Sequence, residues 1–477
     1  MQITSAGDRA LLVTLSGASS ARLRAASVAL RSVPGVVTAI VGHESLYVIG
    51  STDRAAVTRA IDEAKNAPAS EGTHHRIEVS FADEHALDLG EFLAAVHLSR
   101  EEFLRRLADV RLSVRYLGFR AGFAYLDGWP EEWRMPRRPT SRNLVPGGRF
   151  GIAGAMAGFY PVDSPGGWNI LGRTDARLWD PSREPPNLLA PGDEIEITPG
   201  TWSGRLQPAG GLKPAAPLGG ETADVIAPGQ QTTIVGVRDW RRAQYGLTPG
   251  GPFDDEMAAA ANNAVGNRDD APLLECVLVG PRLRFRRDAR VAWCDRELRE
   301  WSASAGEEIE IGRIRGMRGY LAIAGGIDEM RARYAEEPTV LKKGDALSVC
   351  GPASAGLDRL KRVLPQRGDR FTIHVLRGPH EAPPLPEEWE VTPHLNRVGI
   401  RLRPLRAVDA KPRADLPSCG MQFGTLQWHP DGSVLAMGPD HPVTGGYLQP
   451  ATLLSTELWK LAQLQPGDRV RMVHTFG

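Results

Sequence analysis

The sequence predicts a mainly β protein in which an α+β domain is followed by barrel domains, and three observations support this. Residues 1–82 alternate between short apolar strands and two amphipathic helices. The rest of the chain is rich in turns, and the whole sequence holds 52 glycines and 37 prolines. One pattern, a leucine followed by a Gly-Asp turn and an alternating strand, occurs three times. At 477 residues the chain is also too long for one hydrophobic core.

The N-terminal segment predicts an α+β unit without a catalytic motif. Strands are expected at residues 10–15, 36–40, 45–49 and 75–81, and helices at residues 19–31 and 53–65. The order β-α-β-β-α-β is that of the ferredoxin-like split unit. We therefore expect residues 1–82 to serve as a scaffold or docking domain.

The next segment, residues 83–203, changes from helical to extended periodicity. Two short helices are expected between residues 88 and 108, the second capped by Ser99 with Glu102 three residues on. A barrel domain is expected from about residue 112. Its most distinctive part runs from Arg149 to Thr174, RFGIAGAMAGFYPVDSPGGWNILGRT. Glycines separated by apolar residues indicate short strands that meet at tight turns, where backbone approaches backbone or a ligand closely.

Residues 204–223 are rich in Gly, Pro and Ala and lack periodicity, so we interpret them as a linker between two halves. Two further barrels are expected at residues 224–370 and 371–477. The repeated Gly-Asp pattern, at residues 189–197, 341–349 and 464–472, would end each of the three barrels. Ser164-Pro-Gly-Gly-Trp168 and Thr444-Gly-Gly-Tyr447 echo one another, which also indicates related barrels.

The composition excludes several classes of protein. Lys plus Arg equals Asp plus Glu, 57 each, so no net field favours nucleic acid or an anionic membrane. No stretch approaches the ~18 apolar residues of a membrane span, and the N-terminus lacks the pattern of a secretion signal. The four cysteines are widely spaced, and the histidines show no metal-ligand spacing beyond the adjacent His74-His75. We therefore expect no disulfide scaffold, no metal site and a cytoplasmic location.

The segment from Gly118 to Thr174 also carries a long motif. It begins GFRAGFAYLDG at residues 118–128 and continues with MPRRPTSRNLVPGG at residues 135–148. This run resembles the B subunit of bacterial ATP-dependent 5-oxoprolinase. That family is also described as the first subunit of allophanate hydrolase and as the first half of the carboxyltransferase domain of urea amidolyase.

The part after the linker resembles the C subunit of the same family, also described as the second subunit of allophanate hydrolase. The matching motifs include Gly251-Pro-Phe-Asp254, Leu274-Glu275 and Thr444-Gly-Gly-Tyr447. The resemblance implies that the barrels are cyclophilin-like and that the chain is a divergent fusion of the B and C subunits.

The resemblance implies an ATP-dependent hydrolase of a cyclic amide, converting 5-oxoproline to glutamate with a separate A subunit. The implied cofactor is ATP with Mg²⁺. The sequence has no G-x-x-x-x-G-K-[ST] loop, so an ATP site would not be of the P-loop type. Urea amidolyase relatives imply an alternative, a carboxyltransferase that moves a carboxyl group from carboxybiotin on another protein to a urea- or guanidine-like substrate. A third alternative is a catalytically degenerate regulator, because relatives of the first half of the chain are described as inhibitors of a histidine kinase.

Cyclic-amide hydrolysis and carboxyl transfer both need fixed hydrogen-bond donors and cations around a planar group that develops negative charge. We therefore predict catalytic roles for Ser164, Arg173, Asp239 and Arg242. The candidate binding residues are anion partners, backbone donors, aromatic walls and polar motif residues, and for each a structural role is the alternative. They are Tyr125, Arg137, Arg138, Gly154, Gly158, Tyr160, Gly166, Gly167, Trp168, Asp254, Asn262, Glu275, Arg397, Gln427, Asp440, Thr444, Gly445, Gly446 and Tyr447.

The sequence also departs from the family pattern. Leu107 stands where relatives usually carry a histidine. Ala121 and Asp127 replace a proline and a glycine, and Arg241 replaces the glycine of a D-x-G-R motif. Residues 328–338, DEMRARYAEEP, stand in place of a segment rich in Ser and Thr. If the missing histidine is a catalytic acid or base, this chain has lost it, and a degenerate or re-purposed member of the family is then the alternative to an active enzyme.

Overall fold

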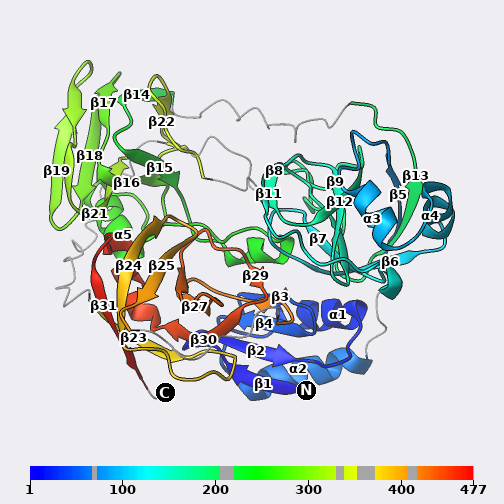
Figure 1. Ribbon diagram of the computed structural model, residues 1–477. Helices are drawn as coiled ribbons and strands as arrows, with labels where there is room; N and C mark the ends of the chain where they lie inside the picture. Colours follow the sequence, from blue (N-terminus) through cyan, green and yellow to red (C-terminus); the bar gives the residue numbers. More distant parts are fainter. Residues whose placement is uncertain (67–71, 205–219, 329–337, 352–370, 407–415, 476–477) are drawn as a thin grey trace.

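The computed structural model describes residues 1–66, 72–204, 220–328, 338–351, 371–406 and 416–475. Its strands fall into four parts, which we name the N-terminal unit, the first barrel, the middle unit and the C-terminal barrel (Figure 1). The fold is mainly β, as predicted, and most of the helices are short connections. None of the helices within these described ranges is long and apolar enough to cross a membrane.

The N-terminal unit is an antiparallel sheet covered on one face by two helices. The strand order is β1 (Gln2–Ser5), β2 (Ala10–Thr14), β4 (Ser45–Ile49) and β3 (Thr38–Val41). The helices are α1 (Ser20–Leu30) and α2 (Arg54–Asn66), and their apolar faces form a core with the sheet that includes Leu11, Leu23, Val48 and Ile61. This arrangement confirms an α+β unit at the N-terminus.

The strand expected at residues 75–81 does not belong to that sheet, so the prediction that it closes the N-terminal unit was wrong. It forms β5 (His74–Val79), which pairs in parallel with β13 (Glu194–Pro199) of the first barrel. Ile77 and Val79 of β5 are buried in the core of that barrel. The N-terminal sheet is completed instead by β1, a four-residue strand that the sequence analysis missed.

The first barrel is a seven-stranded sheet that closes on itself through one bridge. The strand order is β12 (Asn169–Arg173), β9 (Arg149–Ala153), β10 (Met156–Phe159), β7 (Ala124–Asp127), β6 (Arg111–Leu117), β13 and β5. Closure comes from Ser80, whose N–H donates to the carbonyl of Arg173 at 2.7 Å and whose carbonyl accepts from the Arg173 N–H at 2.9 Å. A separate pair, β8 (Arg142–Val145) and β11 (Ser164–Gly166), lies beside the barrel sheet.

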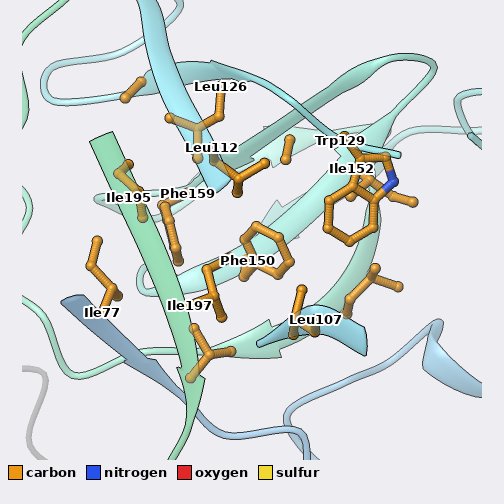
Figure 2. Packing of buried hydrophobic residues seen from close by; sticks show 14 of the residues in the cluster. Ile77, Leu107, Leu112, Leu126, Trp129, Phe150, Ile152, Phe159, Ile195 and Ile197 are labelled. Carbon is orange, nitrogen blue, oxygen red and sulfur yellow. The ribbon is translucent and has the colours of Figure 1, made fainter. Parts of the chain in front are cut away.

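The core of the first barrel is large and aromatic (Figure 2). The helices α3 (Leu89–Ala95) and α4 (Arg100–Leu107) add Phe92, Phe103 and Leu107 to it, and η1 (Glu131–Trp133) adds Trp133. The capping box predicted at the start of α4 is confirmed on its serine side, because the N–H of Glu102 donates to Ser99 Oγ at 3.1 Å.

The middle unit holds two sheets around one apolar core. One sheet has the order β20 (Glu308–Glu310), β17 (Arg282–Phe285), β14 (Glu221–Ala227) and β22 (Ala346–Ser348). The other has the order β15 (Gln231–Val235), β16 (Leu273–Val279), β21 (Arg313–Ile323), β18 (Ala289–Cys294) and β19 (Leu298–Ala303). The helix α5 (Asp255–Ala264) packs on the second sheet, and η2 (Trp240–Tyr245) precedes it.

The predicted linker overlaps β14. Residues 205–219 of that linker lie outside the described residues, but Glu221 to Ala223 form the first part of the strand and pair with β17 and β22. The last three residues of the predicted linker were therefore misassigned. The end of the barrel expected at residues 224–370 also lies outside the described residues, from residue 352 on, as does most of the segment 328–338.

The C-terminal barrel is closed by seven strands. Their order is β23 (Thr372–Arg377), β30 (Leu448–Leu453), β27 (Thr425–Trp428), β28 (Val434–Met437), β25 (Gly399–Pro404), β24 (Glu388–Leu395) and β31 (Arg469–His474). A separate pair, β26 (Cys419–Gly420) and β29 (Thr444–Gly445), repeats the pair beside the first barrel. Two short helices, η3 (Ser455–Glu457) and α6 (Leu458–Gln463), connect β30 to β31.

The three predicted Gly-Asp turns share one geometry. Their glycines have φ values of 90°, 92° and 86°, in the left-handed region, at Gly192, Gly344 and Gly467. Each following aspartate accepts a hydrogen bond from the N–H three residues earlier, at 2.9, 2.7 and 2.9 Å for Asp193, Asp345 and Asp468. The turns lead into β13, β22 and β31. The repeat seen in the sequence is therefore a repeated structural element.

The N-terminal unit packs against the C-terminal barrel (Figure 1). The open face of its sheet buries Tyr47 and Ile40 against Cys419 and Val443. Two hydrogen bonds reinforce the contact: Gln422 Nε2 donates to the carbonyl of Ala6 at 2.7 Å, and the N–H of His43 donates to the carbonyl of Ser418 at 2.7 Å. The two ends of the chain are thus joined in one interface.

Candidate functional site

Five aromatic rings gather in the first barrel, and we call them the aromatic cluster: Tyr116, Phe123, Tyr125, Tyr160 and Trp168. Tyr116 on β6 faces Tyr125 on β7, and their rings stack with centroids 4.4 Å apart. Phe123 contacts Tyr160 and Trp168 edge to face, at 5.3 and 5.4 Å. The three predicted aromatic walls are therefore brought together. Tyr116 and Phe123 were missed, although both flank the glycines of the GFRAGF motif.

The glycines of the predicted site allow these rings to pack closely. A β-carbon on Gly158 would lie 2.8 Å from the carbonyl oxygen of Ala124 and 3.1 Å from the Trp168 ring. One on Gly166 would overlap the Tyr160 hydroxyl, and one on Gly167 would lie 2.8 Å from Ser141 Oγ. Packing therefore requires glycine at positions 158 and 166, whereas at position 167 only the Ser141 hydroxyl would have to turn away.

Gly154 occupies a different environment. It is in the turn between β9 and β10 with φ of 59°, and its N–H donates to the carbonyl of Met135 at 2.6 Å. We expected this N–H to donate to a ligand, but it already donates a hydrogen bond within the protein.

The two arginines of the Pro-Arg-Arg-Pro sequence have different environments. Arg138 donates to Asp88 Oδ1 at 2.7 Å, as Arg142 also does, and Asp88 is buried. Arg137 is exposed and makes no ion pair within the described part of the chain. Its charge nevertheless acts on the hydroxyls of Tyr125 and Tyr160. Arg137 therefore lies beside the aromatic cluster and can meet an anion, whereas Arg138 holds the barrel together.

The tyrosine hydroxyls are neutral donors at physiological pH. Burial raises the pKa of Tyr125 to about 12, with the charge of Arg137 acting in the opposite direction. Burial likewise raises the pKa of Tyr160 to about 12. A protonated phenol beside an exposed guanidinium is suited to a group that carries or develops negative charge.

Ser164 and Arg173, two of the residues predicted to be catalytic, lie in the segment from Arg149 to Thr174, and both side chains already have partners in the protein. Ser164 is buried and its hydroxyl donates to the carbonyl of Val162 at 3.0 Å. The Arg173 guanidinium stacks on Trp202, with Cζ 3.7 Å from the ring centroid, and burial lowers the pKa of this arginine. Trp202 was not predicted.

The C-terminal barrel contributes a second wall next to the aromatic cluster. A β-carbon on Gly118 would overlap the Thr444 hydroxyl, so the GFRAGF loop lies against β29. The hydroxyl of Tyr116 is hydrogen-bonded to the side chain of Ser418. Gln427 Nε2 is buried without a hydrogen-bond partner, 2.6 Å from where a β-carbon of Gly445 would be. We call this region, the aromatic cluster with Arg137, Ser418, Gln427 and Thr444, the junction site.

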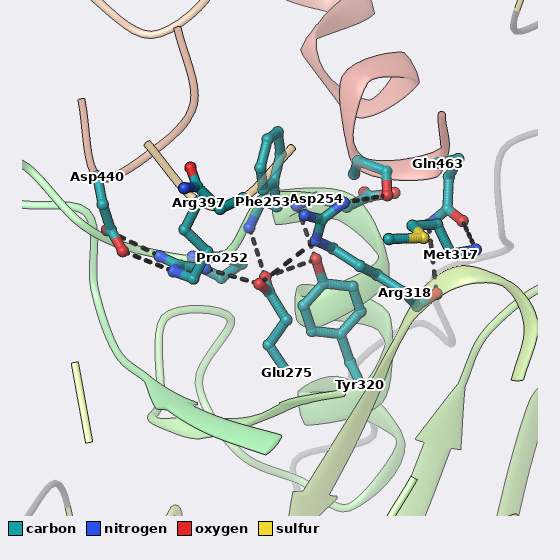
Figure 3. A network of polar contacts seen from close by, with 12 residues as sticks. Pro252, Phe253, Asp254, Glu275, Met317, Arg318, Tyr320, Arg397, Asp440 and Gln463 are labelled. Carbon is teal, nitrogen blue, oxygen red and sulfur yellow. Dashed lines mark hydrogen bonds and ion pairs between the residues drawn. The ribbon is translucent and has the colours of Figure 1, made fainter. Parts of the chain in front are cut away.

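A second group of predicted residues forms a buried ionic network between the middle unit and the C-terminal barrel (Figure 3). Arg397 donates to Glu275 Oε1 at 2.7 Å and to both carboxylate oxygens of Asp440, at 2.7 and 3.0 Å. Burial alone would raise the pKa of Glu275, but the charges of Arg397 and Arg318 hold it below its usual range. Each of these charged side chains has an opposite charge within 4 Å, which is typical of a structural joint.

Two further members of that network were missed in the sequence. Arg318 is fully buried, with its guanidinium 4.2 Å from the Phe253 ring centroid and one N–H donated to the carbonyl of Ala462 at 2.7 Å. The Tyr320 hydroxyl donates to Glu275 Oε2 at 3.0 Å and accepts from the N–H of Asp254 at 2.8 Å. Both lie on β21, most of which is buried.

The remaining predicted residues have local structural partners. Asp254 caps α5 by accepting from the N–H of Met257 at 3.1 Å, and Asp239 caps η2 by accepting from the N–H of Arg241 at 3.1 Å. Asn262 donates to the carbonyl of Ala271 at 2.8 Å.

Three more predicted residues, Arg242, Gly446 and Tyr447, lie in the second half of the chain. Arg242 is on η2, and its Nη1 would lie 4.0 Å from a β-carbon placed on Gly250. The carbonyl of Gly446 accepts from the N–H of Leu416 at 2.9 Å, and Tyr447 stacks on His429 at 4.3 Å.

Comparisons with known proteins identify the family to which both halves of the chain are similar. Models of the carboxyltransferase domain match residues 1–189, for subdomains C and D, and residues 245–474, for subdomains A and B. The 5-oxoprolinase B subunit of Escherichia coli O157:H7 is 35% identical over 188 residues, which cover 38% of this chain and 86% of that protein. The chain belongs to the carboxyltransferase-domain family.

Other members of the carboxyltransferase-domain family match the second half or the whole chain. The 5-oxoprolinase C subunit of Escherichia coli K12 is 27% identical over 283 residues, covering 52% of this chain and 90% of that protein. Urea amidolyase of Lachancea kluyveri is 30% identical over 313 residues, but the chain covers only 17% of it. The crystal structure of TTHA0988 aligns with 98% of this chain and 99% of its own, with a TM-score of 0.82 and 29% identity. The predicted B–C fusion is therefore confirmed.

The departures from the carboxyltransferase-domain pattern have structural consequences that the sequence did not show. Leu107, at the position of the expected histidine, is fully buried in the core of the first barrel with Phe103 and Trp129 (Figure 2). Its position is therefore a core position in this chain and not part of the junction site. Arg241, in place of a glycine, forms an ion pair with Asp239 at 2.8 Å.

Proposed function

We propose that the chain is the fused B–C component of an ATP-dependent, 5-oxoprolinase-like amidohydrolase, which opens a cyclic amide together with a separate A subunit. The observation that carries this proposal is that one polypeptide matches most of a B subunit, 86%, and most of a C subunit, 90%. The two matched halves meet at the junction site, where Gly118 of the first barrel lies against Thr444 of the C-terminal barrel.

The junction site offers groups suited to a small cyclic amide. The buried Nε2 of Gln427 lacks an acceptor, and an amide oxygen would supply one. Arg137 would pair with a carboxylate of the substrate, and Tyr125, the one ring of the aromatic cluster that is only partly buried, would contact a ring. The neutral hydroxyls of Tyr125 and Tyr160 would donate hydrogen bonds to oxygen atoms that gain charge as the amide bond breaks.

The same residues do not fit ATP. A triphosphate is usually held by several cations or backbone donors. Around the junction site Arg138 and Arg142 pair with Asp88. Arg149 and Arg173 are buried or half-buried, so Arg137 is the exposed cation beside the aromatic cluster. We therefore assign ATP and its Mg²⁺ to the partner protein, and we derive no step through them on this chain.

A biotin-dependent carboxyltransferase is the second candidate, because the matching family models are those of a carboxyltransferase domain. Under that function, carboxybiotin would arrive on another protein and the acceptor would be a urea- or guanidine-like molecule. Arg137 and Gln427 would then contact the carboxyl group and the acceptor carbonyl.

Activity measurements with purified components separate the two candidates. We expect no 5-oxoproline-dependent ATP hydrolysis from the chain alone, and glutamate formation coupled to ATP hydrolysis once a cognate A subunit is added. Transfer of a carboxyl group from carboxybiotin to urea, with no glutamate formed from 5-oxoproline, would replace the first proposal by the second. Hydrolysis of 5-oxoproline by the chain alone would show that the partner requirement is wrong.

A further inference from the structure

A cavity lies where three parts of the molecule meet. It has a volume of ≈ 230 Å³, well above the ~30 Å³ that one water molecule occupies in the liquid. It is lined by α1 and β3 of the N-terminal unit, by Leu117 and residues 185–191 of the first barrel, and by residues 243–245 at the end of η2. It shares no lining residue with the junction site or with the ionic network.

Two arginines on one side of α1 line this cavity. Arg24 and Arg31 are two helical turns apart, and Ser27 and Val28 line the cavity between them. Burial lowers the pKa of Arg31, and the nearby charge of Arg24 adds to this effect. No acidic side chain belongs to the lining that the described residues form, and Asp193, which pairs with Arg24, does so from outside the lining.

Both arginines keep donors for a ligand. Arg24 pairs with Asp193, outside the lining, at 3.3 Å. Arg31 donates its Nε–H to the carbonyl of Ser27 at 3.2 Å and one further N–H to Gln244 Oε1. A guanidinium carries five N–H donors in a planar fork. The remaining donors match the geometry of a carboxylate.

Asn187 gives the cavity an acceptor. Its Nδ2 donates to the carbonyl of Tyr245 at 3.1 Å, which fixes the orientation of the amide. Its Oδ1 is buried and has no hydrogen-bond partner. Buried acceptors in proteins are normally paired, so a donor on a bound molecule would complete this one. The rest of the lining is largely apolar and includes Ile40, Leu117 and Leu189.

We propose that this cavity binds a small organic carboxylate that also carries an N–H donor. The carboxylate pairs with Arg24 and Arg31, the N–H donates to Asn187 Oδ1, and the aliphatic part contacts Leu117 and Leu189. Because the lining comes from three parts of the fold, the ligand stabilises their arrangement and raises the melting temperature. The site requires neither ATP nor a partner protein, so it stands independently of the proposed function.

Isothermal titration calorimetry on the full chain, with three probes, tests this site. N-acetylglycine has both groups, propionate has only the carboxylate, and N-methylacetamide has only the N–H. We expect N-acetylglycine to bind about tenfold or more tightly than either of the others, because a charge-assisted pair and a second hydrogen bond act together. Equal binding of N-acetylglycine and propionate would overturn the role of Asn187.

Variants locate the binding. Arg31→Gln should weaken N-acetylglycine binding about tenfold or more, and Asn187→Leu should abolish its advantage over propionate. Arg22→Gln, on the same helix but exposed and outside the lining, is the matched control and should bind as the wild type does. Val28→Trp changes an exposed residue at the cavity and should block it without disturbing the core. The absence of N-acetylglycine binding at millimolar concentration, or binding unaffected by both Arg31→Gln and Val28→Trp, would overturn the proposal.

Discussion

Gly118 of the first barrel lies directly against the hydroxyl of Thr444 in the C-terminal barrel, with no room for a β-carbon between them. The two residues belong to the two halves of the fusion, and both lie in motifs that resemble the family pattern. Their contact sets the loop that precedes Phe123 against β29, the strand on which Gly445 lies beside the unpaired Nε2 of Gln427. The two halves therefore pack against each other at this point.

Gly118→Ala should weaken this contact. The added methyl group overlaps the Thr444 hydroxyl, and overpacking of this kind costs about 1–3 kcal/mol. The measurement is urea unfolding followed by fluorescence. The control is Gly351→Ala, because a β-carbon at Gly351 meets no atom within 4 Å and this residue lies in no helix or strand. An equal free energy of unfolding for the two variants would show that the interface does not need glycine at position 118.

Arg397→Met should be strongly destabilising. It leaves Glu275 buried with only Arg318, at 3.7 Å, as a charged partner, and breaking a buried pair typically costs about 3–5 kcal/mol. Arg403→Met is the matched control, since Arg403 pairs with Glu390 on the surface and such pairs contribute about 0–1 kcal/mol. A loss for Arg397→Met no larger than that of the control would contradict the structural role of the ionic network.

His441 should make the stability fall in mild acid. Burial lowers the pKa of His441 to about 4 from its usual 6.5, so the folded protein keeps this side chain neutral while the unfolded chain binds a proton. The unfolded state then holds more protons between pH 6.5 and 4, and stability is lost as the pH falls through this range. At 1.36 kcal/mol per pKa unit the loss is about 3 kcal/mol.

The test compares unfolding free energies at pH 7 and pH 4.5 for the wild type, His441→Gln and His394→Gln. His394 is exposed and serves as the control. The wild type and His394→Gln should lose more stability on acidification than His441→Gln does. The same loss in all three would show that His441 does not set this pH dependence.

Arg137→Gln and Arg138→Gln should separate ligand binding from stability. Arg137 is exposed beside the aromatic cluster, so its loss should leave the melting temperature unchanged and reduce activity with the partner protein, mainly through a higher KM. Arg138 pairs with the buried Asp88, so its loss should lower the melting temperature. Unchanged KM in Arg137→Gln would remove this residue from the junction site.

Local patterns were sufficient to predict much of the fold. The alternation of strands and helices predicted α1 and α2, and the repeated Gly-Asp turns predicted the strands that follow them, because both depend on residues near one another in sequence. The pairing of β5 with β13 was not predictable in this way. Parallel strands joined by a long connection leave no turn signal, and the buried Ile77 and Val79 fit either sheet.

The candidate site was predictable only as a set of residue types. Glu275, Arg397 and Asp440 were chosen singly as binding residues, and the structure joins them into a paired ionic network. Arg318 completes that network from β21, with no local pattern to distinguish it from a surface arginine. The glycines at positions 158 and 166 were correctly marked as close approaches: the Ala124 carbonyl and the Trp168 ring approach Gly158, and the Tyr160 side chain approaches Gly166.

The central claim is that the two halves form one unit with the junction site between them. Co-expression of residues 1–204 and 220–477 as separate chains, followed by size-exclusion chromatography at micromolar concentration, tests it most directly. The packing of the N-terminal unit on the C-terminal barrel and the Gly118–Thr444 contact predict that the two chains elute together as one complex. Two folded chains that elute separately would contradict the account.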